Sequence, residues 1–175
     1  TLLVSANTEK INMPTLPIGL GCVAASVAAA GHGVDFLDLM GAEDWRARLR
    51  AALTKSAPDL IGISIRNIDD QFSLTPRFLL EGARDVVAVC QAHSPAPVVL
   101  GGAGYSIFPE SALDYTGAPL GIQGEGERPM ALLLDRLSHT FQARARALGV
   151  PTNPAFGGTY DFRPGADFAL ASPAV

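Results

Sequence analysis

The sequence contains few residues of the kinds that bind metals or act as nucleophiles. It has only two cysteines, Cys22 and Cys90, and three histidines, and neither cysteine belongs to a group with metal-ligand spacing. These counts argue against a metal cluster, against a nucleophile–histidine–acid arrangement and against an oxidising compartment. We therefore interpret both cysteines as core residues, and His32, His93 and His139 as surface or helix-capping residues.

Charge is also scarce. Charged residues make up 17% of the chain, the formal net charge is −4, and no basic patch is visible. Nucleic acid and anionic membranes are therefore not expected as partners. Glycine, proline or charge interrupts each apolar run well before it reaches the length of a membrane span. A signal-peptide pattern is missing as well, so a cytoplasmic protein is the simplest interpretation.

The most informative stretch that is present is residues 98–106, Val-Val-Leu-Gly-Gly-Ala-Gly-Tyr-Ser. Its apolar beginning predicts a buried strand. Glycines at the carboxyl end of a strand allow a sharp turn and let a ligand approach the backbone. Ligands of open α/β sheets bind at that end of the strands. Taken alone, the glycines fit a simple turn equally well.

Strand-like and helix-like segments alternate five times along the chain. We expect strands at 2–5, 34–39, 60–65, 96–100 and 119–123, and helices at 17–30, 43–56, 76–92, 109–115 and 128–147. This alternation predicts an α/β, flavodoxin-like (Rossmann-like) fold. The fold is a doubly wound five-stranded parallel sheet with helices on both faces, and residues 60–65 and 98–100 are its central strands.

The composition changes after residue 147. Seven prolines and glycines between 151 and 173 leave little room for regular elements. We expect residues 1–147 to form one domain and 148–175 a linker or arm leading to a catalytic domain absent from this chain. A chain that begins within a strand and ends in such a segment suggests a piece of a longer protein.

Polar loops follow four of the predicted strands, at residues 7–15, 66–71, 101–106 and 124–127. They offer amides, hydroxyls, small residues and backbone groups, but no histidine or cysteine. Because the carboxyl ends of parallel strands share one edge of a sheet, these loops are expected to form one broad polar site for a large ligand.

Several of these segments together resemble a known family. The resemblance is carried, in the family's order, by residues 17–21, 30–34, 38–39, 58–64, 98–102 and 124–127. Over roughly residues 1–139 the chain is similar to the cobalamin-binding domain of class B, cobalamin-dependent radical SAM enzymes of the methyltransferase type.

The resemblance implies a corrinoid, with its cobalt, lying across the strand ends. Its nucleotide tail would run near Gly101, Gly102 and Ser106. The cofactor-binding residues implied are Asn7, Thr8, Glu9, Ser64, Arg66, Asn67, Gly101, Gly102, Gly104, Tyr105, Ser106, Gln123, Gly124, Glu125 and Gly126. No protein residue is expected to ligate the metal, and none is expected to be catalytic.

Many cobalamin carriers place a cobalt-ligating histidine in the first loop, within a D-x-H-x-x-G motif. In this chain the corresponding residues 7–12 include no histidine. The resemblance therefore implies a base-off, histidine-off corrinoid. Within the family, the run from Arg66 to Asp69 is similar to members that methylate unactivated carbons. An arginine keeps its proton, so Arg66 would exclude water below the cobalt without ligating it. We expect Asp69, Asp70 or backbone carbonyls to hold the guanidinium.

The chain departs from the family in one respect, because it has no C-x-x-x-C-x-x-C motif for an iron–sulfur cluster. S-adenosylmethionine and a [4Fe-4S] cluster would therefore bind in a radical SAM domain of the same polypeptide. The hypothesis is the non-catalytic cofactor domain of an enzyme that carries a methyl group from S-adenosylmethionine to a small-molecule or peptide substrate.

Other functions stay open at this point. One alternative is a stand-alone cobalamin carrier or sensor, which would have no radical SAM domain. Another is a cobalamin-dependent radical SAM cyclase, which would have such a domain. A phosphoacceptor receiver is disfavoured. It would need acidic residues after the first and third strands and a lysine after the fifth, and this chain has Asn7, Arg66 and Gly124 near those places. A flavin carrier would need a better phosphate loop than residues 7–14. A dinucleotide site would need G-x-G-x-x-G between a strand and a helix, which is missing.

Overall fold

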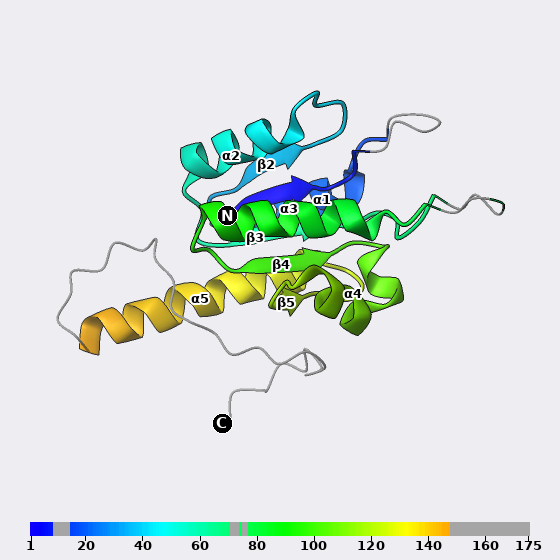
Figure 1. Ribbon diagram of the computed structural model, residues 1–175. Helices are drawn as coiled ribbons and strands as arrows, with labels where there is room; N and C mark the ends of the chain where they lie inside the picture. Colours follow the sequence, from blue (N-terminus) through cyan, green and yellow to red (C-terminus); the bar gives the residue numbers. More distant parts are fainter. Residues whose placement is uncertain (9–14, 71–73, 75–76, 148–175) are drawn as a thin grey trace.

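The computed structural model describes residues 1–8, 15–70, 74 and 77–147, with side chains up to residue 139. Its centre is a five-stranded sheet in the order β2-β1-β3-β4-β5, and every neighbouring pair is parallel (Figure 1). The strands are β1 (Leu2–Ser5), β2 (Asp35–Asp38), β3 (Ile61–Ser64), β4 (Val98–Gly101) and β5 (Leu120–Gly121). The predicted fold is confirmed, with β3 and β4 inside the sheet.

Helices cover both faces of the sheet (Figure 1). They are α1 (Ile18–Ala29), α2 (Trp45–Ser56), α3 (Leu80–His93), α4 (Pro109–Thr116) and α5 (Glu127–Ala147), and a short 3₁₀ helix spans Tyr105–Ile107. Helices α2, α3 and α4 pack on one face, whereas α1 and α5 pack together on the other. The division of the chain at residue 147 remains a prediction, since residues 148–175 lie outside the described residues.

Side chains along each strand alternate between the two faces of the sheet and so contribute to both halves of the core. In β1, Leu2 and Val4 face the α2–α3 side while Leu3 faces the α1–α5 side. Successive strand residues point to opposite faces, so an apolar run of this kind serves both layers at once. This explains why β1, β3 and β4 are almost uniformly apolar and why the sheet can be buried on both sides.

The helix expected from residue 76 begins at Leu80, because the chain just before it pairs with the loop after β3. Asp69 and Phe78 form an isolated antiparallel bridge. The amide of Leu79 donates to the carbonyl of Ile68 at 2.8 Å, and the Arg77 amide donates to Asp70 Oδ1 at 2.9 Å. This pairing holds residues 77–79 out of the helix and against the loop after β3.

One core prediction is wrong. Cys90 is buried beneath α3, as expected, but Cys22 is exposed. Helix α1 turns Leu20 and Val27 toward the sheet, and a residue two positions after Leu20 lies on nearly the opposite side of the helix. The partly buried Val23 and Ala24 continue the stripe of Leu20 and Val27, and Cys22 lies outside it.

The histidines lie at helix ends or on the surface. His32 follows α1, and its Nε2 is 2.9 Å from Asp135 Oδ1 on α5. The His93 ring hydrogen-bonds to the Val89 carbonyl at the end of α3, and His139 is exposed. Among the described helices, none is both long and apolar enough to cross a bilayer.

The two thiols should differ sharply in reactivity. Burial raises the pKa of Cys90 to about 12, so its reactive thiolate is scarce near pH 8, whereas Cys22 is open to solvent. In a titration of the native protein with a chromogenic disulfide, we expect one thiol to react rapidly and the second only after unfolding. Cys22→Ser should abolish the rapid phase. Two rapid thiols in the native protein would contradict this packing.

Candidate functional site

The carboxyl ends of the parallel strands bring the predicted binding segments to one edge of the molecule, at the right in Figure 1. Backbone hydrogen bonds continue past the strands and join the loops. The Ala6 amide donates to the carbonyl of Ser64 at 3.2 Å, and the amide of Ile65 donates to Gly101 at 2.8 Å. The loops after β1, β3 and β4 therefore form one connected surface.

Two glycines let the loop after β4 lie directly on the loop after β3. Gly102 has φ +97°, and a Cβ there would be 2.5 Å from the Ile65 carbonyl oxygen and 2.9 Å from Ser64 Oγ. A Cβ on Gly104 would lie 2.9 Å from the carbonyl of Arg66. The sequence interpretation was that a ligand needs this space. In the structure the neighbouring backbone lies in this space, so these glycines have a packing reason, and the need of a ligand for it stays a prediction.

Ser106 joins the loops after β4 and β5. Its hydroxyl donates to the Gly102 carbonyl at 2.9 Å and accepts from the Gly124 amide at 2.9 Å. The Gln123 side chain donates to the Ser106 carbonyl at 3.2 Å. Four of the predicted binding residues thus hold one another in place, which fixes the edge beside β5.

Among the predicted site residues with a side chain that the structure describes, Tyr105 is the buried one, only 3% exposed. Its hydroxyl lies where a Cβ on Gly121 would be, and burial raises the pKa of the phenol. The ring is therefore a packing element of the core beneath the loops.

The remaining predicted residues lie in or beside the loops at various depths. Glu9 is outside the described residues. The half-buried members are Asn7, Thr8, Ser64, Gly101 and Gly126, and the exposed ones are Arg66, Asn67, Gln123, Gly124 and Glu125. Apart from Arg66 and Glu125, the described residues of this set carry no formal charge, so neutral polar groups dominate the surface.

The partner of Arg66 was not anticipated. Its Nη1 donates to the hydroxyl of Thr15, which lies at the end of the loop after β1. The acidic group of Asp70 is engaged by Arg77 instead, through the backbone amide at 2.9 Å and Nε at 3.8 Å. No local signal in the sequence could have paired Thr15 with Arg66, since 51 positions separate them.

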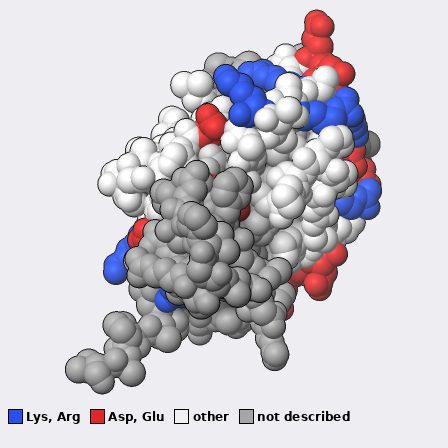
Figure 2. All heavy atoms as spheres, turned by 90° about the vertical axis from the view of Figure 1, so that its left-hand side faces the viewer, with Lys and Arg blue, Asp and Glu red and all other residues white. Residues whose placement is uncertain are grey.

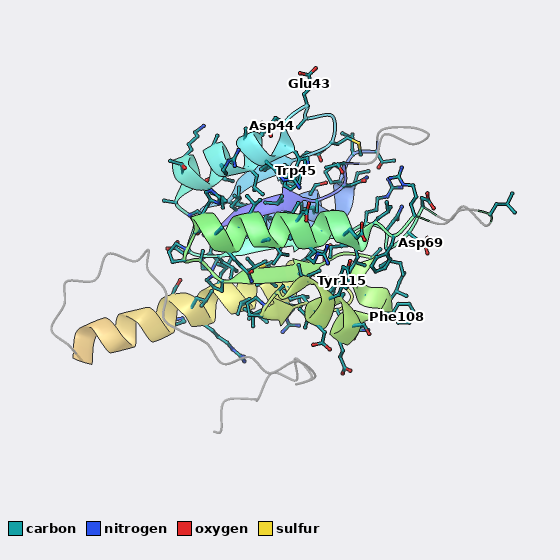
Figure 3. All side chains as sticks on the ribbon, viewed as in Figure 1. Glu43, Asp44, Trp45, Asp69, Phe108 and Tyr115 are labelled. Atoms are coloured by element: carbon teal, nitrogen blue, oxygen red, sulfur yellow. The ribbon has the colours of Figure 1, made fainter. Side chains whose placement is uncertain are left out.

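The loops also carry large exposed apolar side chains. Of the exposed large hydrophobic residues in the described part of the chain, all but Phe36 lie in these loops or at their ends. We call this group the apolar rim: Leu16, Ile18, Leu74, Phe78, Ile107 and Phe108. Figure 3 shows Phe108 and Asp69 at the same edge. Figure 2 faces the left-hand side of Figure 1, away from this edge, and charges of both signs are visible there.

An edge of this composition suits a large amphipathic ligand. Ligand sites combine apolar surface with a small number of placed polar groups, and exposed apolar patches commonly mark binding surfaces. Within the described residues, no three or more histidine, cysteine or acidic side chains are grouped to hold a metal ion. The described residues of the predicted site offer backbone, amide and hydroxyl groups, with Arg66 and Glu125 as the charged side chains.

Comparisons with known proteins agree with this geometry. A family model described as "B12 binding domain" matches residues 4–134. The chain is 31% identical over 170 residues to tryptophan 2-C-methyltransferase from Streptomyces laurentii, covering 96% of this chain and 28% of that protein.

Two solved structures of the radical S-adenosylmethionine methyltransferase TsrM from Kitasatospora setae are similar as well. One holds tryptophan and the analogue aza-SAM, with a TM-score of 0.71, and the other holds cobalamin and a [4Fe-4S] cluster, with a TM-score of 0.72. Both are 28% identical and are matched over 86% of this chain, which spans 26% and 25% of their chains. The chain thus spans about a quarter of the length of these relatives.

Two adjacent glycines provide a matched test of the loop contact. Gly102→Ala should destabilise the protein by about 1–3 kcal/mol or more, because it forces an alanine to positive φ and into the Ile65 carbonyl. Gly101→Ala should change the free energy of unfolding by less than about 1 kcal/mol, since its Cβ would lie 3.6 Å from the Ile122 carbonyl oxygen. Urea unfolding of both variants measures this, and equal stabilities would refute the contact.

Proposed function

Because the chain belongs to the B12-binding domain family, we propose that it holds cobalamin, base-off and histidine-off, across the carboxyl edge of its sheet. We further propose that it is the corrinoid domain of a radical SAM methyltransferase that carries a methyl group from S-adenosylmethionine to a substrate. The observation that carries the proposal is the family match over residues 4–134, which includes all four loops of this edge.

The groups at this edge fit the cofactor. A corrin is a broad ring with a large apolar surface and peripheral amides, and it needs neutral hydrogen-bonding partners more than charged ones. The amides of Asn7, Asn67 and Gln123, with the backbone around Gly101, supply such partners, and the apolar rim supplies contact area. Cobalamin, when bound, supplies a cobalt centre able to carry a methyl group.

The lower face of the corrin would lack a histidine. Residues 1–31 contain none, and none occurs in the segments 64–70, 101–106 or 123–126. Arg66, which follows the buried Ile65 just after β3, is the candidate for this place. Its guanidinium does not lose its proton, so it would exclude water and oppose positive charge at the cobalt without ligating it.

The catalytic partner in this proposal is a radical SAM region that binds S-adenosylmethionine and a [4Fe-4S] cluster. The two solved structures described above are of a methyltransferase, and one of them holds such a cluster. The substrate is proposed only as a small molecule or peptide. A stand-alone cobalamin carrier or sensor is the second candidate, because the matching family model describes B12 binding and not methyl transfer.

Arg66→Ala tests the proposal in protein reconstituted with hydroxocobalamin. A unit positive charge a few ångströms from the cobalt stabilises its lower oxidation state relative to the higher one by about 1–4 kcal/mol. This free energy corresponds to roughly 40–170 mV in a one-electron reduction potential. We expect the wild type to bind cobalamin with a base-off spectrum and no histidine ligand. The variant should still bind, with a water ligand and a lower Co(II)/Co(I) potential.

Spectroelectrochemistry gives the potential, and electron paramagnetic resonance of the Co(II) form reports the lower axial ligand. Arg66→Lys is the matched control for charge, because it keeps the positive charge and loses the planar fork; it should lie nearer the wild type in potential. If the wild type fails to bind cobalamin, the proposed function is wrong. If Arg66→Ala matches the wild type in ligand and potential, Arg66 is an ordinary loop residue.

A further inference from the structure

Thr15 is held where the loop after β1 meets α1. Just beyond it, the Ile18 amide donates to the Leu16 carbonyl at 2.9 Å and the Gly21 amide donates to Pro17 at 3.0 Å. These bonds and the fixed φ of proline set the path of the chain next to Thr15. A β-branched side chain on such a backbone has few conformations, so the position of the hydroxyl is well defined.

That hydroxyl accepts a hydrogen bond from Nη1 of Arg66. The contact connects the loop after β1 to the loop after β3, beside the backbone bond between Ala6 and Ser64. Arg66 is exposed, and an arginine side chain with many rotamers has no single position unless a partner holds it. Thr15 is the partner that orients this guanidinium.

The neutrality of the partner has an electrostatic consequence. A carboxylate in the same place would offset the charge of the guanidinium, whereas a hydroxyl orients it and leaves the charge in full. Asp70, an acidic residue of the same loop, is engaged by the amide and Nε of Arg77. The hydroxyl contact therefore gives Arg66 a fixed direction while preserving its field.

We propose that Thr15 is a positioning residue that holds the Arg66 guanidinium at the corrinoid site and thereby sets the reduction potential of the bound cobalamin. This inference rests on the proposed function, because it requires a corrinoid beside Arg66. Thr15 acts through Arg66, so its contribution should vanish when Arg66 is removed.

The test compares two substitutions at one position in cobalamin-loaded protein. Thr15→Val keeps the branched shape and removes the hydroxyl, while Thr15→Ser keeps the hydroxyl. We expect Thr15→Val to lower the Co(II)/Co(I) potential toward the value of Arg66→Ala and to admit water as a lower ligand in the Co(II) resonance spectrum. Thr15→Ser should keep the wild-type potential and spectrum.

Thr54→Val is the matched control. It makes the same chemical change on α2, where the Thr54 hydroxyl donates to the Arg50 carbonyl at 3.0 Å, and it should leave the potential unchanged. The double variant Thr15→Val/Arg66→Ala should show the potential of Arg66→Ala alone, since coupled residues are not additive.

The possible outcomes separate the two proposals. If Arg66→Ala lowers the potential and Thr15→Val does not, the role of Thr15 is wrong and the proposed function stands. An additive shift in the double variant would also refute action through Arg66. If Arg66→Ala has no effect, or the wild type does not bind hydroxocobalamin, the proposed arrangement at Arg66 fails and the role of Thr15 fails with it.

Discussion

The close backbone contact between the loops after β3 and β4 is the constraint on which the candidate site depends. Gly102 and Gly104 allow it, because at either position a Cβ would meet atoms of the neighbouring loop at 2.9 Å or less. Ser106 then extends the connection to the loop after β5 through its hydroxyl. A connected edge results, and it carries the neutral polar groups and the apolar rim.

The fold was largely predictable from the sequence because its signals are local and repeated. Apolar runs such as Ile61–Ile63 mark strands buried on both faces, and the alternation with helices determines a parallel sheet. Errors arose where a tertiary contact overrides local pattern. Pairing of Asp69 with Phe78 shortens α3 at its start. Cys22 was assigned to the core from its apolar neighbours, although Leu20 and Val27 place the buried face of α1 on nearly the opposite side of the helix.

The site was predictable only as a set of segments. Parallel strand ends must meet at one edge, so the sequence could bring Ser64, Gly102 and Gln123 together without knowing their contacts. It could not show that Ser106 bonds to the loops on either side or that Thr15 holds Arg66, because such contacts join residues distant in the chain. It also missed that Tyr105 is buried and that the apolar rim surrounds the loops.

The central claim is that one cobalamin lies across the carboxyl edge of this sheet. Amide hydrogen exchange of the protein with and without hydroxocobalamin tests it most directly, because exchange reports each loop separately. The account predicts slower exchange with cobalamin at residues 6–8, 64–67, 101–106 and 123–126, and unchanged exchange in α2. Unchanged exchange in these loops, or protection confined to the amino-terminal edge of the sheet, would contradict it.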